Sequence, residues 1–155
     1  MLKEGLIGEL KSSEKFFNKS TSCLEEKDSS FAPKEGLFTV ANHVAHAALS
    51  LEWFMDGVFN PKGFNMDFEA HVAEVKSCTS LQVARDRFKR AYAAAVETVS
   101  SKSDEELQAP LPEGPIMGGV PRLAAISSIS EHTAHHRGAL SVYSRLLGKE
   151  PEMPY

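Results

Sequence analysis

Two pairs of histidines stand at spacings that can place their imidazoles around one metal ion. His132 and His136 are four residues apart, and His43 and His46 are three residues apart. On a helix, either spacing puts both side chains on one face, about one turn apart. Neutral imidazole nitrogens are common ligands of divalent transition metals. The sequence therefore predicts a metal site if the two segments are helices that face each other.

A pair of ligands on one helix does not complete such a site, because zinc in proteins is held by at least three side chains. The helix that carries His43 and His46 can supply the third ligand, and the spacing alone does not decide between these two. The opposing interpretation is that these histidines are polar surface residues on the solvent-facing side of a helix and bind no metal. Five of the six histidines fall into the two clusters, and only His71 stands apart, which favours the metal site.

The elements that must position these histidines are helices. Apolar residues recur at three- and four-residue steps in four long segments. These segments cover about residues 5–24, 38–59, 79–101 and 119–148. A less regular passage, residues 64–77, is expected to form a short additional helix. No alternating strand pattern competes, so we predict an all-α four-helix bundle that occupies residues 1–155 as a single domain.

Three of the helix ends carry sequence signals. Thr39 is the expected N-cap of the second long helix. The stretch Thr79–Gln82 has the form of a capping box at the start of the third. Gly148 is expected to end the fourth helix, which begins near Gly119 with Pro121 in its first turn.

The composition excludes several classes of function. The chain has 17 basic and 21 acidic residues, a net charge of −4, and no basic block of the kind that binds nucleic acid. Its apolar runs are far too short for a membrane span, and its N-terminus does not have the form of an export signal. Cys23 and Cys78 stand in no metal or redox pattern. We therefore expect a cytoplasmic protein without a nucleic-acid or membrane partner.

Residues 132–140 resemble the H-x-x-x-H-R-G-Q-[IL] signature in the last helix of the DinB-like (DinB/YfiT) proteins. The stretch 39–46, followed by Glu52-Trp53-Phe54, is similar to the second helix of that family, in which a histidine precedes an acidic–aromatic pair. The sequence departs from the pattern at Ala139, where many members carry Gln, and in having His135 as an extra imidazole.

The resemblance implies an up-down-down-up four-helix bundle that holds one divalent metal ion with three histidines. His132 and His136 match the two ligands of the last helix. His46 matches the third ligand better than His43, because Trp53 then falls at the family's usual distance after it. Arg137 is expected first of all to form a structural ion pair. The residues expected to line the pocket or to replace a ligand are His43, His135, Trp53, Tyr143 and Arg137.

The resemblance also bears on function. Three protein ligands and an open position are the arrangement of a catalytic metal. The family includes transferases that use low-molecular-weight thiols such as bacillithiol or mycothiol. We therefore expect a metal-dependent transferase or hydrolase that acts on a small molecule, with zinc as the ion and nickel, iron or manganese as alternatives, and a homodimer as the assembly. The competing hypotheses are a non-catalytic metal-binding or ligand-sensing bundle, and a plain structural bundle with incidental histidines.

Overall fold

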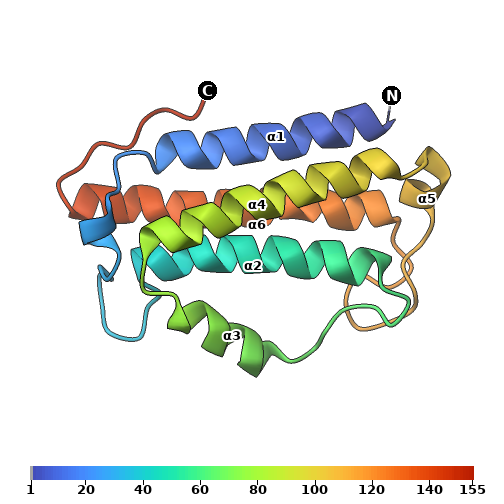
Figure 1. Ribbon diagram of the computed structural model, residues 1–155, viewed down its shortest axis with the longest axis horizontal. Coiled ribbons are helices and arrows are strands. Elements are labelled where there is room, and N and C mark those ends of the chain that lie inside the picture. Colours follow the sequence, from blue (N-terminus) through green and yellow to red (C-terminus); the bar gives the residue numbers. More distant parts are fainter. Residues whose placement is uncertain (1) are drawn as a thin grey trace.

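In the computed structural model, which describes residues 2–155, four long helices pack side by side (Figure 1). They are α1 (Leu2–Ser20), α2 (Val40–Phe59), α4 (Leu81–Ser101) and α6 (Arg122–Leu146). The shorter elements are a 3₁₀ helix, η1 (Glu26–Asp28), and the helices α3 (Phe68–Ser77) and α5 (Asp104–Gln108). Residues 2–155 contain no strand, and the predicted all-α four-helix bundle is confirmed.

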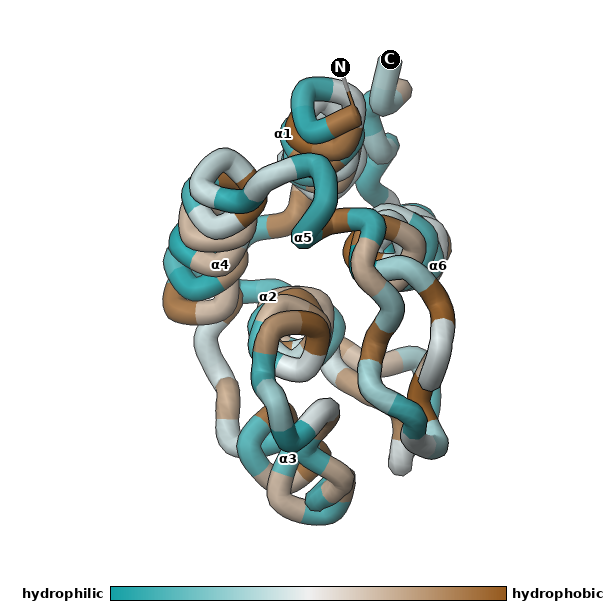
Figure 2. Tube along the Cα trace, turned by 90° about the vertical axis from the view of Figure 1, so that its right-hand side faces the viewer, coloured by the Kyte–Doolittle hydropathy of each residue, from teal (hydrophilic) through white to brown (hydrophobic). Residues whose placement is uncertain are grey.

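The directions of the long helices give the up-down-down-up order. Helices α1 and α6 run from right to left in Figure 1, whereas α2 and α4 run from left to right. Since α2 and α4 are parallel, the chain between them must return along the bundle, and α3 lies in that connection. Viewed along the bundle, α3 lies outside the four long helices, next to α2 (Figure 2).

The start of α2 is fixed by the predicted cap. The Thr39 hydroxyl accepts a hydrogen bond from the Asn42 backbone N–H at 3.1 Å, and the Asn42 side-chain oxygen accepts one from the Thr39 N–H at 3.2 Å. This reciprocal pair satisfies two amide groups that the first turn of a helix leaves unpaired. The cap therefore sets the position of His43, which directly follows Asn42.

The ends of α4 and α6 differ in how well they were predicted. The N-cap of α4 is Ser80, whose hydroxyl accepts from the Val83 N–H, so the expected capping box of Thr79 and Gln82 is wrong by one residue. The Gln82 side chain donates instead to Asp86. At the other end, α6 stops before Gly148, which has the left-handed φ of 73° that the prediction requires.

Polar contacts anchor α3 beside the first half of α2. The Asn42 side-chain amide donates to the carbonyls of Val75 and Cys78, at 3.0 and 2.9 Å. Arg87 of α4 donates to carboxylates on both neighbours, Glu52 of α2 and Glu74 of α3, each at 2.6 Å. These contacts hold α3 against the part of α2 that carries His43 and His46.

Close packing at the other end of α2 requires a glycine. A Cβ atom built on Gly57 would lie 2.1 Å from the Phe64 ring, whereas one built on Gly8 of α1 would meet nothing within 4 Å. Gly57→Ala is therefore expected to lower the free energy of unfolding by about 1–3 kcal/mol, the usual cost of overpacking. Gly8→Ala, the matched control, should raise it by about 0.5–1 kcal/mol because alanine favours the helix. Urea unfolding of both variants measures the difference, and equal shifts would contradict the packing of Phe64 on α2.

Within residues 2–155, no helix combines the length and the apolar character that crossing a bilayer requires.

Candidate metal centre

Helices α2 and α6 bring three histidines to one point. His46 extends from α2, and His132 and His136 extend from successive turns of α6. One possible ligand nitrogen of each residue lies within 4.8 Å of the other two. The Nε2 atoms of His132 and His136 are 3.3 Å apart, and the His46 ring centroid is 5.1 Å from that of His132 and 4.8 Å from that of His136.

The chemistry of these donors fits a divalent transition metal. His46 Nδ1 is buried and has no hydrogen-bond partner among the described residues, although a buried polar atom normally has one. A metal ion would supply the partner for such a nitrogen. Three imidazoles suit zinc, nickel, iron and copper alike, and side chains from two rigid helices can hold them in place.

The surroundings keep these imidazoles neutral, which is the form that binds a metal. Burial lowers the pKa of His136 from its ordinary 6.5 to about 2, and it lowers the pKa values of His43 and His46 to about 4. Nearby imidazoles add to the effect, because two positive charges at this separation repel each other. Burial also lowers the pKa of His132.

The stability of the metal-free protein is expected to fall as the pH is lowered from 6.5 towards 4. In this window the unfolded chain, whose histidines titrate near 6.5, binds more protons than the folded chain, so stability rises with pH. His46→Gln removes one of the depressed groups and should make the loss smaller. Urea unfolding of both proteins at pH 7.5, 6.5 and 5.0 gives the comparison. The same stability at all three pH values in the wild type would show that these imidazoles are not held neutral.

A cavity of about 700 Å³ opens beside the three histidines. Its size lies in the range of small-molecule sites. The segment before α2 contributes Gly36, Leu37 and Phe38 to its wall, and α6 contributes further residues. Besides His132 and His136, those residues are Glu131, His135, Ala139 and Tyr143.

Three of the other residues predicted for the site lie around this cavity. His43 is a largely buried residue of the cavity lining, and its Nδ1 atom is 2.9 Å from Nδ1 of His136. His135 is exposed at the rim, and its ring centroid is 5.0 Å from that of His136. Tyr143 borders the cavity, and its hydroxyl donates a hydrogen bond of 3.0 Å to the Phe38 carbonyl.

Trp53 and Arg137 lie elsewhere. Trp53 is seven residues beyond His46, about 10 Å further along α2, and its indole N–H donates to the Asn65 carbonyl at 2.7 Å. Arg137 lies about 100° round α6 from His136, and its guanidinium group stacks over the Phe16 ring of α1 at 5.8 Å. The ion pairs found among residues 2–155 do not include the one expected for Arg137.

One histidine near the site was missed. His71 of α3 lies against His46, with ring centroids 5.5 Å apart. The sequence predicted a short helix over residues 64–77, but it held no signal that this helix would pack beside His46. That placement depends on the long-range contacts of Asn42 with the end of α3.

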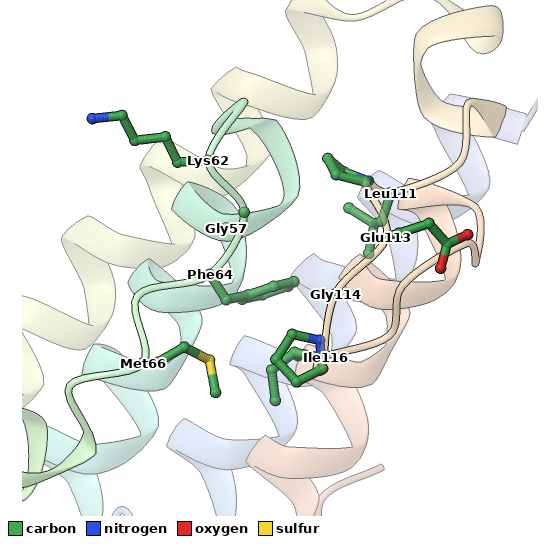
Figure 3. Close-up of a pocket in the computed structure, with 11 residues that line it drawn as sticks. Gly57, Lys62, Phe64, Met66, Leu111, Glu113, Gly114 and Ile116 are labelled. Atoms are coloured by element: carbon green, nitrogen blue, oxygen red, sulfur yellow. The ribbon is translucent and has the colours of Figure 1, made fainter.

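A second cavity, of about 170 Å³, lies at the far end of α2 (Figure 3). Gly57 on its wall is eleven residues beyond His46, about 16 Å along the helix. Phe64, Met66 and Ile116 give it apolar walls, and Lys62 points away from the centre of the view. It brings together no set of metal-ligating side chains, so the histidine cluster is the candidate site.

Comparison with known proteins agrees with this architecture. The model of the DinB family matches residues 10–155 of the chain. No curated protein matches the sequence.

Among the solved structures that resemble the chain, three do so over almost its whole length. YfiT from Bacillus subtilis, described as a probable metal-dependent hydrolase with an unusual four-helix bundle topology, is 14% identical, with a TM-score of 0.74 over 96% of this chain and 89% of its own. A DinB-like protein from Bacillus cereus is 19% identical, with a TM-score of 0.75 over 94% and 92%. The DinB-like protein YjoA from Bacillus subtilis is 18% identical, with a TM-score of 0.68 over 97% and 96%. At these identities the likeness establishes a shared fold.

Proposed function

The chain belongs to the DinB family, and from that premise we propose that it binds one divalent metal ion through His46, His132 and His136 and acts as a metal-dependent enzyme on a small molecule. The observation that carries the proposal is the convergence of three ligand nitrogens, one from each of these histidines, within 4.8 Å of one another. The description of YfiT as a probable metal-dependent hydrolase supports the same class of activity.

A bound divalent ion would supply Lewis-acid chemistry, which polarises a carbonyl or activates a water or a thiol as a nucleophile. The chain itself supplies the rigid frame. His132 and His136 are fixed one turn apart on α6, and His46 faces them from α2. The low pKa values of these imidazoles leave their lone pairs free at neutral pH.

The cavity beside the histidines favours an enzyme over a metal sensor, because it offers room for a substrate. Leu37 and Phe38 present apolar surface to an entering molecule. Glu131 is the acidic residue among those that line the cavity, and its carboxylate can take up a proton from an incoming nucleophile. The Tyr143 hydroxyl donates a hydrogen bond to the Phe38 carbonyl, so its role in the proposal is to fix this side of the cavity.

Two reactions fit this arrangement, and they differ in the nucleophile. With water the protein is a hydrolase. With a low-molecular-weight thiol, such as the bacillithiol or mycothiol used by transferases of this family, it is a thiol S-transferase. The zinc-loaded protein is the form expected to be active, and nickel, iron or manganese can take the place of zinc in such a site.

The test compares the zinc-loaded protein with the chelator-treated protein. Each is assayed for hydrolysis of a panel of esters and amides, and for conjugation of bacillithiol, mycothiol and cysteine to an electrophile. Activity that is lost on chelation, restored by added zinc and missing from His132→Ala would support the proposal. Activity that is equal with and without metal would overturn it.

A further inference from the structure

We propose that His43 is a positioning residue that fixes the tautomer and the ring orientation of the ligand His136. The inference deepens the proposed metal site and rests on it. It starts from one contact, the 2.9 Å separation between the Nδ1 atoms of His43 and His136. Both side chains are largely buried, with His43 8% and His136 4% exposed.

Counting protons shows which way this hydrogen bond runs. Two imidazole nitrogens at 2.9 Å form a hydrogen bond only if one carries a proton and the other offers a lone pair. The second nitrogen of His136, Nε2, faces Nε2 of His132 at 3.3 Å, on the side where the ligands converge. A nitrogen that binds a metal carries no proton. The proton of neutral His136 therefore lies on Nδ1 and is donated to Nδ1 of His43, which carries its own proton on Nε2.

The acceptor itself is held in place by aromatic rings. His43 is 8% exposed, and its ring meets Tyr143 edge to face at 5.0 Å and Phe38 at 5.8 Å. Tyr143 and Phe38 are joined by the hydrogen bond from the tyrosine hydroxyl to the phenylalanine carbonyl. The His43 ring thus packs against two side chains that are tied to each other, which restricts its rotation.

This role separates the two histidines of α2. Their three-residue spacing makes them near neighbours on the helix. His46 belongs to the converging set of nitrogens, whereas His43 is outside that set and contacts its member His136. Groups that accept a hydrogen bond from a ligating histidine raise its basicity and fix its orientation, and removing one usually weakens metal binding by about 10–100-fold.

The test measures the dissociation constant for zinc by competition with a chromophoric chelator. His43→Leu has a similar volume but no acceptor, and it should weaken zinc binding by about 10–100-fold. His43→Gln offers a side-chain carbonyl and should recover most of the affinity. His135→Ala, which removes an exposed imidazole from the same cavity, is the matched control and should bind zinc like the wild type. The cobalt(II) absorption spectrum should be alike in all four proteins, because the three ligands remain.

The outcomes separate this inference from the proposed function. A wild type that binds no zinc contradicts the metal site itself. If the wild type and His43→Leu bind zinc with equal affinity, the role of His43 is overturned, while the proposed metal site is unaffected. A cobalt spectrum that loses one nitrogen ligand in His43→Leu makes His43 a ligand, which also overturns the role.

A second measurement does not depend on the folding of a variant. Long-range ¹H–¹⁵N NMR of the zinc-loaded wild type should show His136 protonated at Nδ1 and bound through Nε2. The opposite tautomer would overturn the inference.

Discussion

Replacing His132 or His136 by alanine is expected to weaken zinc binding by more than about 100-fold, beyond the range of a residue that only supports a ligand. Each change leaves two of the three converging nitrogens, and two imidazoles do not make a stable site for zinc. The dissociation constant is measured by chelator competition on the metal-free proteins. The folded state should persist in both variants, because each change shortens one side chain that lines the cavity.

The control for this experiment is His135→Ala. His135 is on the same helix and also carries an imidazole, but it is exposed and lies outside the converging set. We expect its zinc affinity to equal that of the wild type. If His135→Ala lost the metal and His132→Ala kept it, the assignment of the ligands on α6 would be wrong.

Truncation of Phe88 is expected to have the largest effect on stability. Its ring is 1% exposed, stacks on Phe17 of α1 at 4.4 Å and contacts Tyr92 at 4.8 Å. Phe88→Ala removes this packing and leaves a cavity, which should lower the free energy of unfolding by about 3–5 kcal/mol. That is a large part of the 5–15 kcal/mol typical of a domain. Guanidinium unfolding of the metal-free protein measures the loss.

Val83→Ala on the same helix is the matched control for Phe88→Ala. Val83 is 60% exposed, so its truncation should change the free energy of unfolding by less than about 0.5 kcal/mol. The folded fraction of Phe88→Ala should still bind one zinc ion per chain, because Phe88 belongs neither to the histidine cluster nor to the lining of its cavity. A loss below about 1 kcal/mol for Phe88→Ala would contradict the buried packing of Phe88 against Phe17.

The fold could be predicted because the long helices have local sequence patterns that can be recognised without knowledge of the tertiary structure. Apolar residues at three- and four-residue steps gave the four long helices, and side-chain chemistry marked ends such as Thr39 and Gly148. The box at Thr79 failed because Ser80, one residue later, competes for the same role. The helix α5 was missed because five residues are too few for a periodic pattern to appear.

The site was predictable to the extent that its residues share a helix. The spacing of His132 and His136 guarantees that they are neighbours, and the histidine-bearing stretch of α2 follows the same rule. What lies opposite a side chain depends on tertiary packing. For that reason the sequence did not predict that His71 of α3 would lie against His46. Trp53 instead holds the loop at Asn65, and Arg137 packs on Phe16 of α1.

The most direct test of the account is the position of the metal. Crystals of the protein loaded with zinc are measured on both sides of the zinc absorption edge, and the anomalous difference map locates the ion. We expect one strong peak per chain, within bonding distance of a nitrogen from His46, His132 and His136. A map without a peak there, or with its strongest peak at other residues, would contradict the central claim that these three histidines form the metal site.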